Sequence, residues 1–215
     1  MKKCLKQRYP SLPIKIEMNQ KEVWNKIALP WRCFREKPQK EIANFLKNKK
    51  GKILDLGCGS GRNFLKFKGE LYALDFSERM IELAKERAQK LKIKSKFFVS
   101  EVYNLPFENN FFDYALFASV LHCIKSKAKR KKALKELYRV LKKGGKAIIT
   151  VWSRKSERIK NKPKESLIPW TVKGKKYMRY YYIYDYPEFK HLLKKVGFEI
   201  LSLKENKNLI AIVEK

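Results

Sequence analysis

Residues 54–61 read Leu-Asp-Leu-Gly-Cys-Gly-Ser-Gly, and the predicted fold rests on this segment. The apolar run Ile53 to Leu56 predicts a short buried strand. The alternating glycines that follow permit a tight turn and let a ligand approach the backbone closely. A strand that runs into such a loop predicts a nucleotide-binding site at the end of an α/β sheet.

Three acidic residues follow the predicted strands in order. Asp55 lies two residues before the first glycine, where its carboxylate would face a ligand's ammonium group, directly or through water. Asp75 ends the second predicted strand, where it can accept hydrogen bonds from both ribose hydroxyls. Glu101 follows the third strand and can accept a hydrogen bond from an adenine amino group. Each acid alone could be an exposed or capping residue, but their joint order favours a cofactor site.

The loop lacks the spacing of a dinucleotide site, because position 62 is Arg rather than Gly or Ala. A phosphate-free nucleoside that carries a cation fits better, and S-adenosylmethionine is such a molecule. Besides the three acids, the predicted cofactor contacts are Gly57, Cys58, Gly59, Phe76, Val102 and Ser119.

Strands and helices alternate outward from this loop. Strands are predicted at 53–56, 71–75, 96–99, 112–118 and 147–151, and helices at 20–28, after Pro38, and at 77–92, 126–142 (ended by Gly144-Gly145) and 187–195. This alternation predicts a parallel sheet covered on both faces. Two last strands, at 198–203 and 208–213, predict an antiparallel hairpin. The predicted fold class is therefore α/β and Rossmann-like, with a mostly parallel seven-stranded sheet.

The length of 215 residues fits one domain. We expect a basic N-terminal extension at 1–19 and a single domain at 20–215, with a cofactor half at about 40–152 and a basic substrate-binding insertion at about 154–180. No apolar run approaches the ~20 residues that cross a bilayer, and no secretion signal is evident. We therefore expect no membrane contact and a cytoplasmic location. The four cysteines form no C-x-x-C pair, so no metal site is expected.

The charge is extreme, since 52 Lys and Arg face 21 Asp and Glu, a formal net charge of +31. Such a field attracts polyanions. The plainer explanation is a lysine-rich proteome of a heat-loving organism, but such proteomes usually enrich Glu as well. The basic segments 125–143 and 154–180 both follow strands, at the end of the sheet where this fold binds ligands. A charged helix face is often merely solvated, yet this placement favours a phosphate-binding rim.

These motifs resemble the class I S-adenosylmethionine-dependent methyltransferases. The matching segments stand in that family's order: residues 54–61, Asp75, the E-x-x-N-L-P-F stretch at 101–107, FFDYALFAS at 111–119 and LYRVLKKGGK at 137–146. The resemblance spans roughly residues 40–152. It implies the fold and the cofactor, and leaves the methyl acceptor open.

A second set of segments looks like the eukaryotic-type tRNA methyltransferases that esterify the carboxylate of a wobble 5-carboxymethyluridine. It comprises 23–28 (VWNKIA), Arg35, 120–122 (VLH), Lys129, Arg130, 151–152 (VW), 168–170 (IPW), 173–174 (KG), 179–181 (RYY) and 208–213 (NLIAIV). Two departures stand out: Cys123 follows His122 where the family has a second histidine, and Lys37-Pro38-Gln39 replaces an aromatic-proline motif. The resemblance implies two partners, tRNA and a small zinc-binding activator subunit.

A carboxylate that attacks a sulfonium methyl group needs no general base, because it is ionised near neutral pH. The enzyme must hold the two reactants in line, so the candidate catalytic residues are positioning groups: His122, Arg35 and Arg179. Each could instead be a packing or surface residue. Residues expected to bind substrate through stacking or cationic contacts are Trp24, Lys129, Arg130, Trp152, Trp170, Tyr180 and Tyr181.

Two other functions fit the fold. A small-molecule methyltransferase acting on a quinone, lipid or small acid would need no such charge. A non-catalytic RNA-binding protein would tolerate a damaged cofactor loop, whereas Asp55, Gly57, Gly59 and Asp75 are all intact.

Overall fold

The structure, a computed structural model, describes residues 19–215. The predicted extension at 1–19 lies, apart from Asn19, outside the described residues. Within the described part of the chain, no helix is long and apolar enough to cross a membrane.

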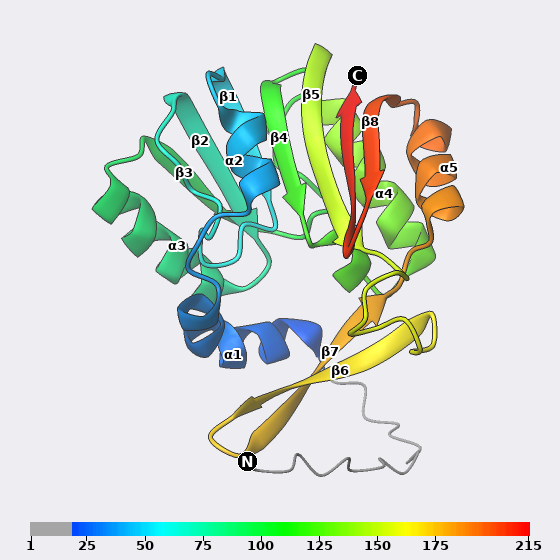
Figure 1. The fold of residues 1–215 in the computed structure, drawn as a ribbon. Helices are drawn as coiled ribbons and strands as arrows, with labels where there is room; N and C mark the ends of the chain where they lie inside the picture. The colour runs from blue at the N-terminus through cyan, green and yellow to red at the C-terminus, as the bar shows by residue number, and fades with distance from the viewer. Residues whose placement is uncertain (1–18) are drawn as a thin grey trace.

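A seven-stranded sheet forms the centre, in the order β3-β2-β1-β4-β5-β9-β8. Its strands are β1 (Lys50–Leu56), β2 (Lys68–Asp75), β3 (Ser95–Val99), β4 (Phe112–Ala118), β5 (Leu141–Trp152), β8 (Glu199–Glu205) and β9 (Asn208–Glu214). The first five run parallel, while β9 is antiparallel to both β5 and β8 (Figure 1). The predicted fold class is confirmed.

Helices cover both faces of the sheet because successive residues of its strands point to opposite sides. Ile53 belongs to the core under α2 (Lys40–Leu46) and α3 (Glu78–Leu91), whereas Leu54 belongs to the core under α4 (Lys127–Val140) and α5 (Tyr186–Val196). Both side chains are fully buried. The near-continuous apolar character of β1 is thus explained by burial on two sides.

Two predicted boundaries were wrong. The helix before the fifth strand ends at Val140, and β5 begins at once at Leu141, so Gly144-Gly145 lies inside the strand and does not end the helix. A Cβ atom at Gly145 would lie 2.8 Å from the Lys142 carbonyl oxygen, which explains a glycine at this bend of the strand. The first helix, α1 (Gln20–Phe34), also continues past residue 28 despite Pro30.

The basic segment 154–180, which shows no periodicity in the sequence, contains most of an antiparallel hairpin. Its strands are β6 (Glu165–Val172) and β7 (Lys175–Tyr182). Lys173 and Gly174 join them with positive φ angles of 46° and 78°, as two-residue hairpin turns require. The Lys-Gly pair was the available signal for this hairpin.

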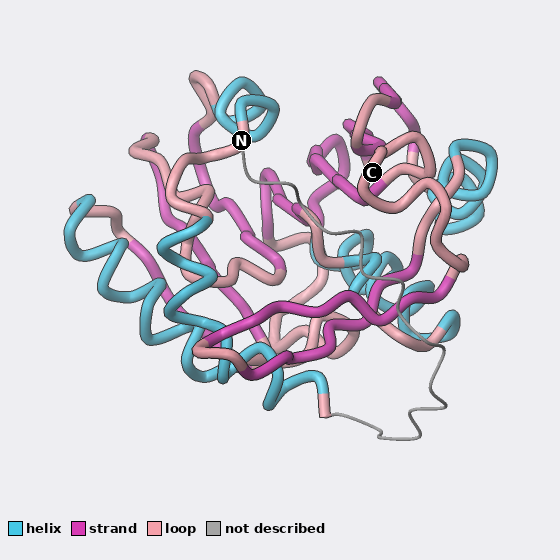
Figure 2. The backbone as a smooth tube through the Cα atoms, turned by 60° about the horizontal axis from the view of Figure 1, so that its bottom comes forward, coloured by secondary structure: helices cyan, strands magenta, loops and turns pink. Residues whose placement is uncertain are grey.

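Helix α1 and the hairpin together cross the carboxyl ends of the parallel strands (Figures 1 and 2). The Gln20 side chain joins them, since its Nε2 donates to the Met178 carbonyl (3.2 Å) and its Oε1 accepts from the Tyr180 amide (2.9 Å). On its other side α1 is fixed to the start of α3, where Asn25 Oδ1 accepts from Ser77 Oγ (2.5 Å). These bonds fix α1 and the β6–β7 hairpin across the end of the sheet where ligands bind in this fold.

The parallel pair β1–β2 leads to a stability prediction. Gly69 pairs with Gly51, and a Cβ atom at Gly69 would lie 2.0 Å from the Gly51 carbonyl oxygen. Gly69→Ala must therefore separate the two strands, and we expect a loss of about 2 to 3 kcal/mol in the free energy of unfolding, measured by urea titration. Gly174→Ala, with open space around it, should lose only about 1 kcal/mol through its positive φ. Equal losses would contradict the steric explanation.

Candidate functional site

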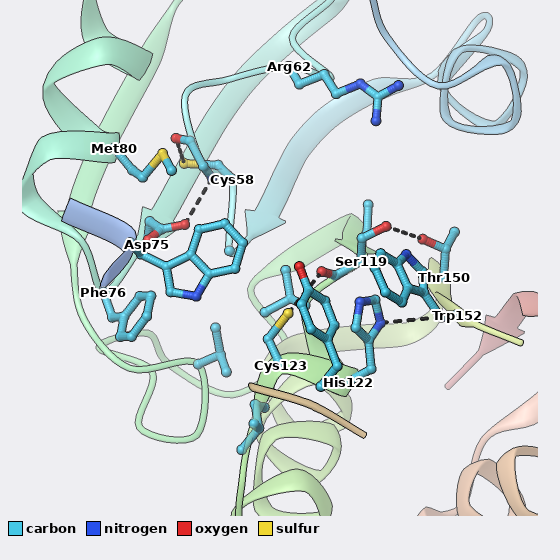
Figure 3. A pocket seen from close by; sticks show the side chains of 18 of the residues that line it. Cys58, Arg62, Asp75, Phe76, Met80, Ser119, His122, Cys123, Thr150 and Trp152 are labelled. Atoms are coloured by element: carbon cyan, nitrogen blue, oxygen red, sulfur yellow. Dashed lines mark hydrogen bonds between the residues drawn. The ribbon is translucent and has the colours of Figure 1, made fainter. Parts of the chain in front are cut away.

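A cavity of about 960 Å³ lies at the carboxyl ends of the parallel strands, and residues of α1 and of the β6–β7 hairpin also line it. Figure 3 shows side chains around it, with Asp75 and Phe76 on one side and His122 and Trp152 on the other. The cavity therefore has two ends: one is built from the glycine-rich loop and the end of β2, and the other from the segments that follow β4 and β5.

The glycine-rich loop is bonded to the end of β2. The amides of Gly57 and Cys58 both donate to the Leu74 carbonyl, at 2.7 and 2.9 Å. Gly57 has φ +75°, and a Cβ atom there would lie 2.4 Å from Val120 Cγ2. Gly59 differs, because the nearest atom to its Cβ position is Met80 Sδ at 3.9 Å. The backbone at Gly59 is thus open to a ligand in the cavity.

Asp75 lines the cavity and organises its surroundings. Its Oδ2 accepts from the Gly59 amide (2.9 Å) and its Oδ1 from the Ser77 amide (3.0 Å), while Ser77 Oγ caps α3. Burial raises the pKa of Asp75 to about 6, and the two amide bonds act in the opposite direction. The lone pairs that remain on both oxygens can still accept from ligand hydroxyls.

Asp55 lies beneath the loop and is not part of the cavity wall, so it faces a ligand at most through water or the loop. It is buried, and its Oδ2 has no hydrogen-bond partner among residues 19–215. Burial, reinforced by the nearby Asp75, raises the pKa of Asp55 to about 7. A cation close to the loop would relieve this cost, so the arrangement fits a ligand that carries an ammonium group.

The Asp55 carboxyl should make stability depend on pH. In the folded protein it keeps its proton to about pH 7, whereas its ordinary pKa is 3.8. The folded state therefore binds more protons between these values, and stability should fall as pH rises through this window. Asp55→Asn should flatten the fall. We would compare urea unfolding of the two ligand-free proteins between about pH 5 and about pH 8.

His122 acts with the opposite sign, because its folded pKa of about 3 lies below its ordinary 6.5. It adds stability as pH rises between those values. Since His122 is present in both proteins, its effect cancels in the comparison. Parallel curves for wild type and Asp55→Asn would contradict a raised Asp55 pKa.

The remaining predicted cofactor residues lie on the wall of the same cavity. Glu101, Val102, Phe76 and Ser119 all line the cavity. Ser119 has a positive φ of 63°, and its Oγ lies 3.4 Å from Thr150 Oγ1. Gln39, which sequence reasoning missed as a site residue, also lines the cavity, and its Nε2 donates to Ser119 Oγ (3.5 Å). The departure Lys37-Pro38-Gln39 from the family pattern was the signal.

The other end of the cavity holds His122 against two rings. His122 is buried, and its ring centroid lies 5.5 Å from that of Trp152 and 5.3 Å from that of Tyr181. Trp152 and Tyr181 are themselves parallel, at 4.4 Å. His122 Nδ1 accepts from the Trp152 amide (3.4 Å). Burial, with a smaller contribution from Arg179, lowers the pKa of His122 to about 3, so the imidazole is neutral near pH 7.

Arg179 is enclosed by aromatic rings and does not line the cavity. Its guanidinium lies 5.1 to 5.9 Å from ring centroids of Trp24, Trp31, Trp170 and Tyr181, and it donates to the Tyr181 hydroxyl (2.7 Å). Burial lowers its pKa. No salt bridge to Arg179 occurs within residues 19–215, so a buried cation is compensated mainly by ring faces.

Arg35 does line the cavity. Its guanidinium carbon lies 5.0 Å from the Phe34 ring and 5.3 Å from the Trp31 ring, and its Nε has no hydrogen-bond partner in the described part of the chain. Burial lowers its pKa. A second cation thus stands at this end of the cavity with an unused donor.

The predicted substrate-binding residues divide into two groups. Trp24, Lys129, Trp152 and Tyr181 line the cavity, and Lys129 stands at its edge, 4.8 Å from the Tyr103 ring.

The other group, Arg130, Trp170 and Tyr180, lies outside the cavity wall. Arg130 is buried, donates to the Ile124 and Lys125 carbonyls (2.8 and 2.9 Å) and stacks on Tyr182 at 3.8 Å, which leaves it no surface for a phosphate. Tyr180 is buried and donates to the Lys125 carbonyl (3.2 Å). Trp170 packs on Trp31 and Phe34. These three residues therefore support the wall from behind.

Among the described residues, no group of three or more His, Cys, Asp or Glu side chains is arranged to hold a metal ion.

Comparison with known proteins places these features in a context. A family model described as a methyltransferase domain matches residues 54–149. A protein of Encephalitozoon cuniculi named "Putative methyltransferase" is 30% identical over 171 residues, which are 76% of this chain and 78% of that protein. The tRNA (carboxymethyluridine(34)-5-O)-methyltransferase of Schizosaccharomyces pombe is 27% identical over 207 residues, covering 84% and 88% of the two chains.

A protein of the same name from Arabidopsis thaliana is 34% identical over 59% of this chain, which spans only 29% of the plant protein. Among solved structures, the 1,6-didemethyltoxoflavin-N1-methyltransferase of Burkholderia thailandensis, with bound S-adenosylhomocysteine, matches with a TM-score of 0.70 at 18% identity, over 97% of this chain and 92% of that one. A methyltransferase of Methanosarcina mazei matches with a TM-score of 0.67 at 22% identity, over 83% and 98%. At these identities the structures support the fold alone.

Proposed function

The chain belongs to the class I S-adenosylmethionine-dependent methyltransferases, and we propose that it methylates the carboxylate of a 5-carboxymethyluridine at the wobble position of tRNA. The observation that carries the proposal is Arg35, which lines one end of the cavity, together with Arg179, which is buried behind the Tyr181 ring of that wall. Arg35 and Arg179 are both desolvated, and each has an Nε without a partner in residues 19–215. Desolvated arginines that have no acidic partner within residues 19–215 favour an anionic acceptor at this end of the cavity.

The cofactor end of the cavity fits S-adenosylmethionine. Asp75 would accept the ribose hydroxyls, Glu101 would accept the adenine amino group, and the open backbone at Gly59 would lie against the nucleoside. When bound, the cofactor supplies a methyl group activated by a sulfonium. The protein's own contribution is to fix the acceptor in line with that group and to exclude water.

The opposite end fits an acceptor that arrives already ionised. The His122 imidazole, with a pKa near 3, is a weak base and would remove a proton from a hydroxyl or amine poorly. A carboxylate needs no such step at neutral pH. His122 instead positions the Trp152 and Tyr181 rings, against which a pyrimidine could stack.

The nucleic-acid part of the proposal is supported by charge and by relatives. A net charge of +31 attracts a polyanion, and Lys129 stands at the edge of the cavity. The fission yeast relative is named for this tRNA activity, and its similarity to this chain extends over most of both chains. A cytoplasmic location and a small zinc-binding activator subunit belong to the same proposal.

The test is a methyl-transfer assay. The purified protein, with and without an activator subunit, receives radiolabelled S-adenosylmethionine and bulk tRNA, and labelled nucleosides are identified after mild alkali. Alkali-labile label at a wobble uridine is the expected result, because a methyl ester hydrolyses readily. Alkali-stable label in tRNA would contradict the ester chemistry. No label in tRNA despite measured cofactor binding would favour a small-molecule acceptor.

A further inference from the structure

A third arginine lies outside the cavity wall, against one of the rings that form this wall. Arg158 lies in the loop between β5 and β6, and its guanidinium carbon is 5.5 Å from the Trp152 ring. The Tyr181 ring is parallel to the Trp152 ring at 4.4 Å, and both residues line the cavity. Arg158 is exposed, so its guanidinium reaches solvent while it lies against the Trp152 ring.

The loop holds Arg158 in this place through its neighbours. Ile159 is fully buried in a small core with Ile168, Tyr181 and Ile183, against which Trp152 and Cys123 pack. The neighbouring acid, Glu157, forms an ion pair with Lys160 at 2.7 Å and so does not neutralise Arg158. Within the same loop, Arg154 Nη1 donates a hydrogen bond to the Lys162 carbonyl (2.5 Å). The position of Arg158 is therefore set by the packing of the adjacent Ile159 and by hydrogen bonds within the loop.

The three arginines share one neighbour, Tyr181. Arg179 donates to it, and Arg35, Arg158 and Arg179 all act on it electrostatically, although burial keeps its pKa high. No salt bridge to any of the three occurs within residues 19–215. The neighbouring Trp170 indole Nε1 is also buried, and it has no hydrogen-bond partner in the part of the chain that the structure describes. Like charges gathered without an acid cost free energy, which a bound anion would recover.

We propose that Arg35, Arg158 and the Tyr181 hydroxyl form an oxyanion site for the acceptor carboxylate, that Arg158 closes it from the solvent side and determines specificity, and that Arg179 is a positioning residue. The identification of the anion rests on the proposed function. The shared chemistry is an oxyanion with several acceptor oxygens, carried either by the acceptor carboxylate or by a phosphate of the same nucleotide. We commit to the carboxylate, because Trp152 and Tyr181 place the site inside the cavity rather than on its outer surface.

The test measures binding without methyl transfer. Calorimetry with S-adenosylhomocysteine present would titrate 5-carboxymethyluridine, uridine 5′-monophosphate and uridine into wild type, Arg158→Ala, Arg158→Lys and Lys195→Ala. Lys195 is exposed on α5 and serves as the charge-matched control. We expect Arg158→Ala to weaken 5-carboxymethyluridine binding about tenfold, to leave uridine unchanged, and to be partly rescued by Arg158→Lys.

Each other result is decisive. A loss confined to uridine 5′-monophosphate would overturn the carboxylate assignment in favour of a phosphate. Unchanged binding of both anionic probes, or the same loss in Lys195→Ala, would overturn the site. Since Arg158 is exposed, its variants should fold, and thermal unfolding would verify this. If the tRNA assay yields no ester while 5-carboxymethyluridine binding depends on Arg158, the proposed function fails and the anion site stands.

Discussion

Asp75→Asn is expected to weaken cofactor binding about 100-fold, the sum of two lost charge-assisted hydrogen bonds. Asp75 is placed to accept both ribose hydroxyls, and it also fixes the Gly59 amide that borders the nucleoside. An asparagine keeps the shape but turns one of the two acceptor atoms into a donor, which would face the Gly59 or Ser77 amide. Isothermal titration with S-adenosylmethionine and with S-adenosylhomocysteine measures the loss.

Asp113→Asn is the matched control for Asp75→Asn. Asp113 is the second residue of β4, at the opposite end of the sheet, where it accepts from the Lys52 amide (2.8 Å) and pairs with Lys142 (2.6 Å). Its loss should lower stability and leave cofactor affinity unchanged. Equal affinity losses in the two variants would mean that Asp75 acts only through the fold. Unchanged affinity in Asp75→Asn would remove it from the cofactor site.

The cofactor end could be predicted from the sequence because its determinants are local. A strand, three glycines and an acid at the end of the next strand define a turn whose hydrogen bonds join two consecutive strands of the chain, such as those of Gly57 and Cys58 to Leu74. The two-sided burial of β1 is visible in the same way, as an apolar run without alternation. Resemblance to a family then added the cofactor's identity.

The acceptor end could not be predicted to the same depth, because its contacts are long-range. The Gln20 amide that joins α1 to β7 bonds Met178 and Tyr180, more than 150 positions away along the chain. Nothing in the residues around Arg179 shows that it would lie among Trp24, Trp31 and Trp170. Its burial follows only once the helix and the hairpin are packed together.

Arg130 illustrates a second cause. In the sequence it is one of many cations in a basic helix, and each could contact a phosphate. In the structure its guanidinium caps the loop before α4 and stacks on Tyr182, whereas its neighbour Lys129 faces the cavity. Composition reports how many cations a segment carries. Which of these cations is buried depends on which face of α4 packs against the β6–β7 hairpin, and the sequence of the hairpin shows no periodic pattern that would predict this.

Arg35→Ala is expected to lower kcat/KM for tRNA by about 100-fold, because Arg35 would bind the acceptor carboxylate and hold it in line with the methyl group. Arg35 is the arginine that reaches the cavity from α1 with an unused Nε donor. Cofactor affinity should not change, because the Arg35 guanidinium packs on the Trp31 and Phe34 rings, which are not among the predicted cofactor contacts. Methyl transfer to tRNA and cofactor titration on the same preparation measure both quantities.

Arg32→Ala is the control on the same helix, since Arg32 forms an exposed ion pair with Glu86 (2.6 Å) and does not line the cavity. It removes the same charge from the same helix and should leave kcat/KM within about threefold, as exposed ion pairs contribute little. Arg35→Lys should recover only part of the activity, because an ammonium lacks the planar fork that binds two carboxylate oxygens. Equal losses of kcat/KM in Arg32→Ala and Arg35→Ala would mean that Arg35 acts only through general electrostatic attraction of tRNA. Arg35 would then not be part of the acceptor site.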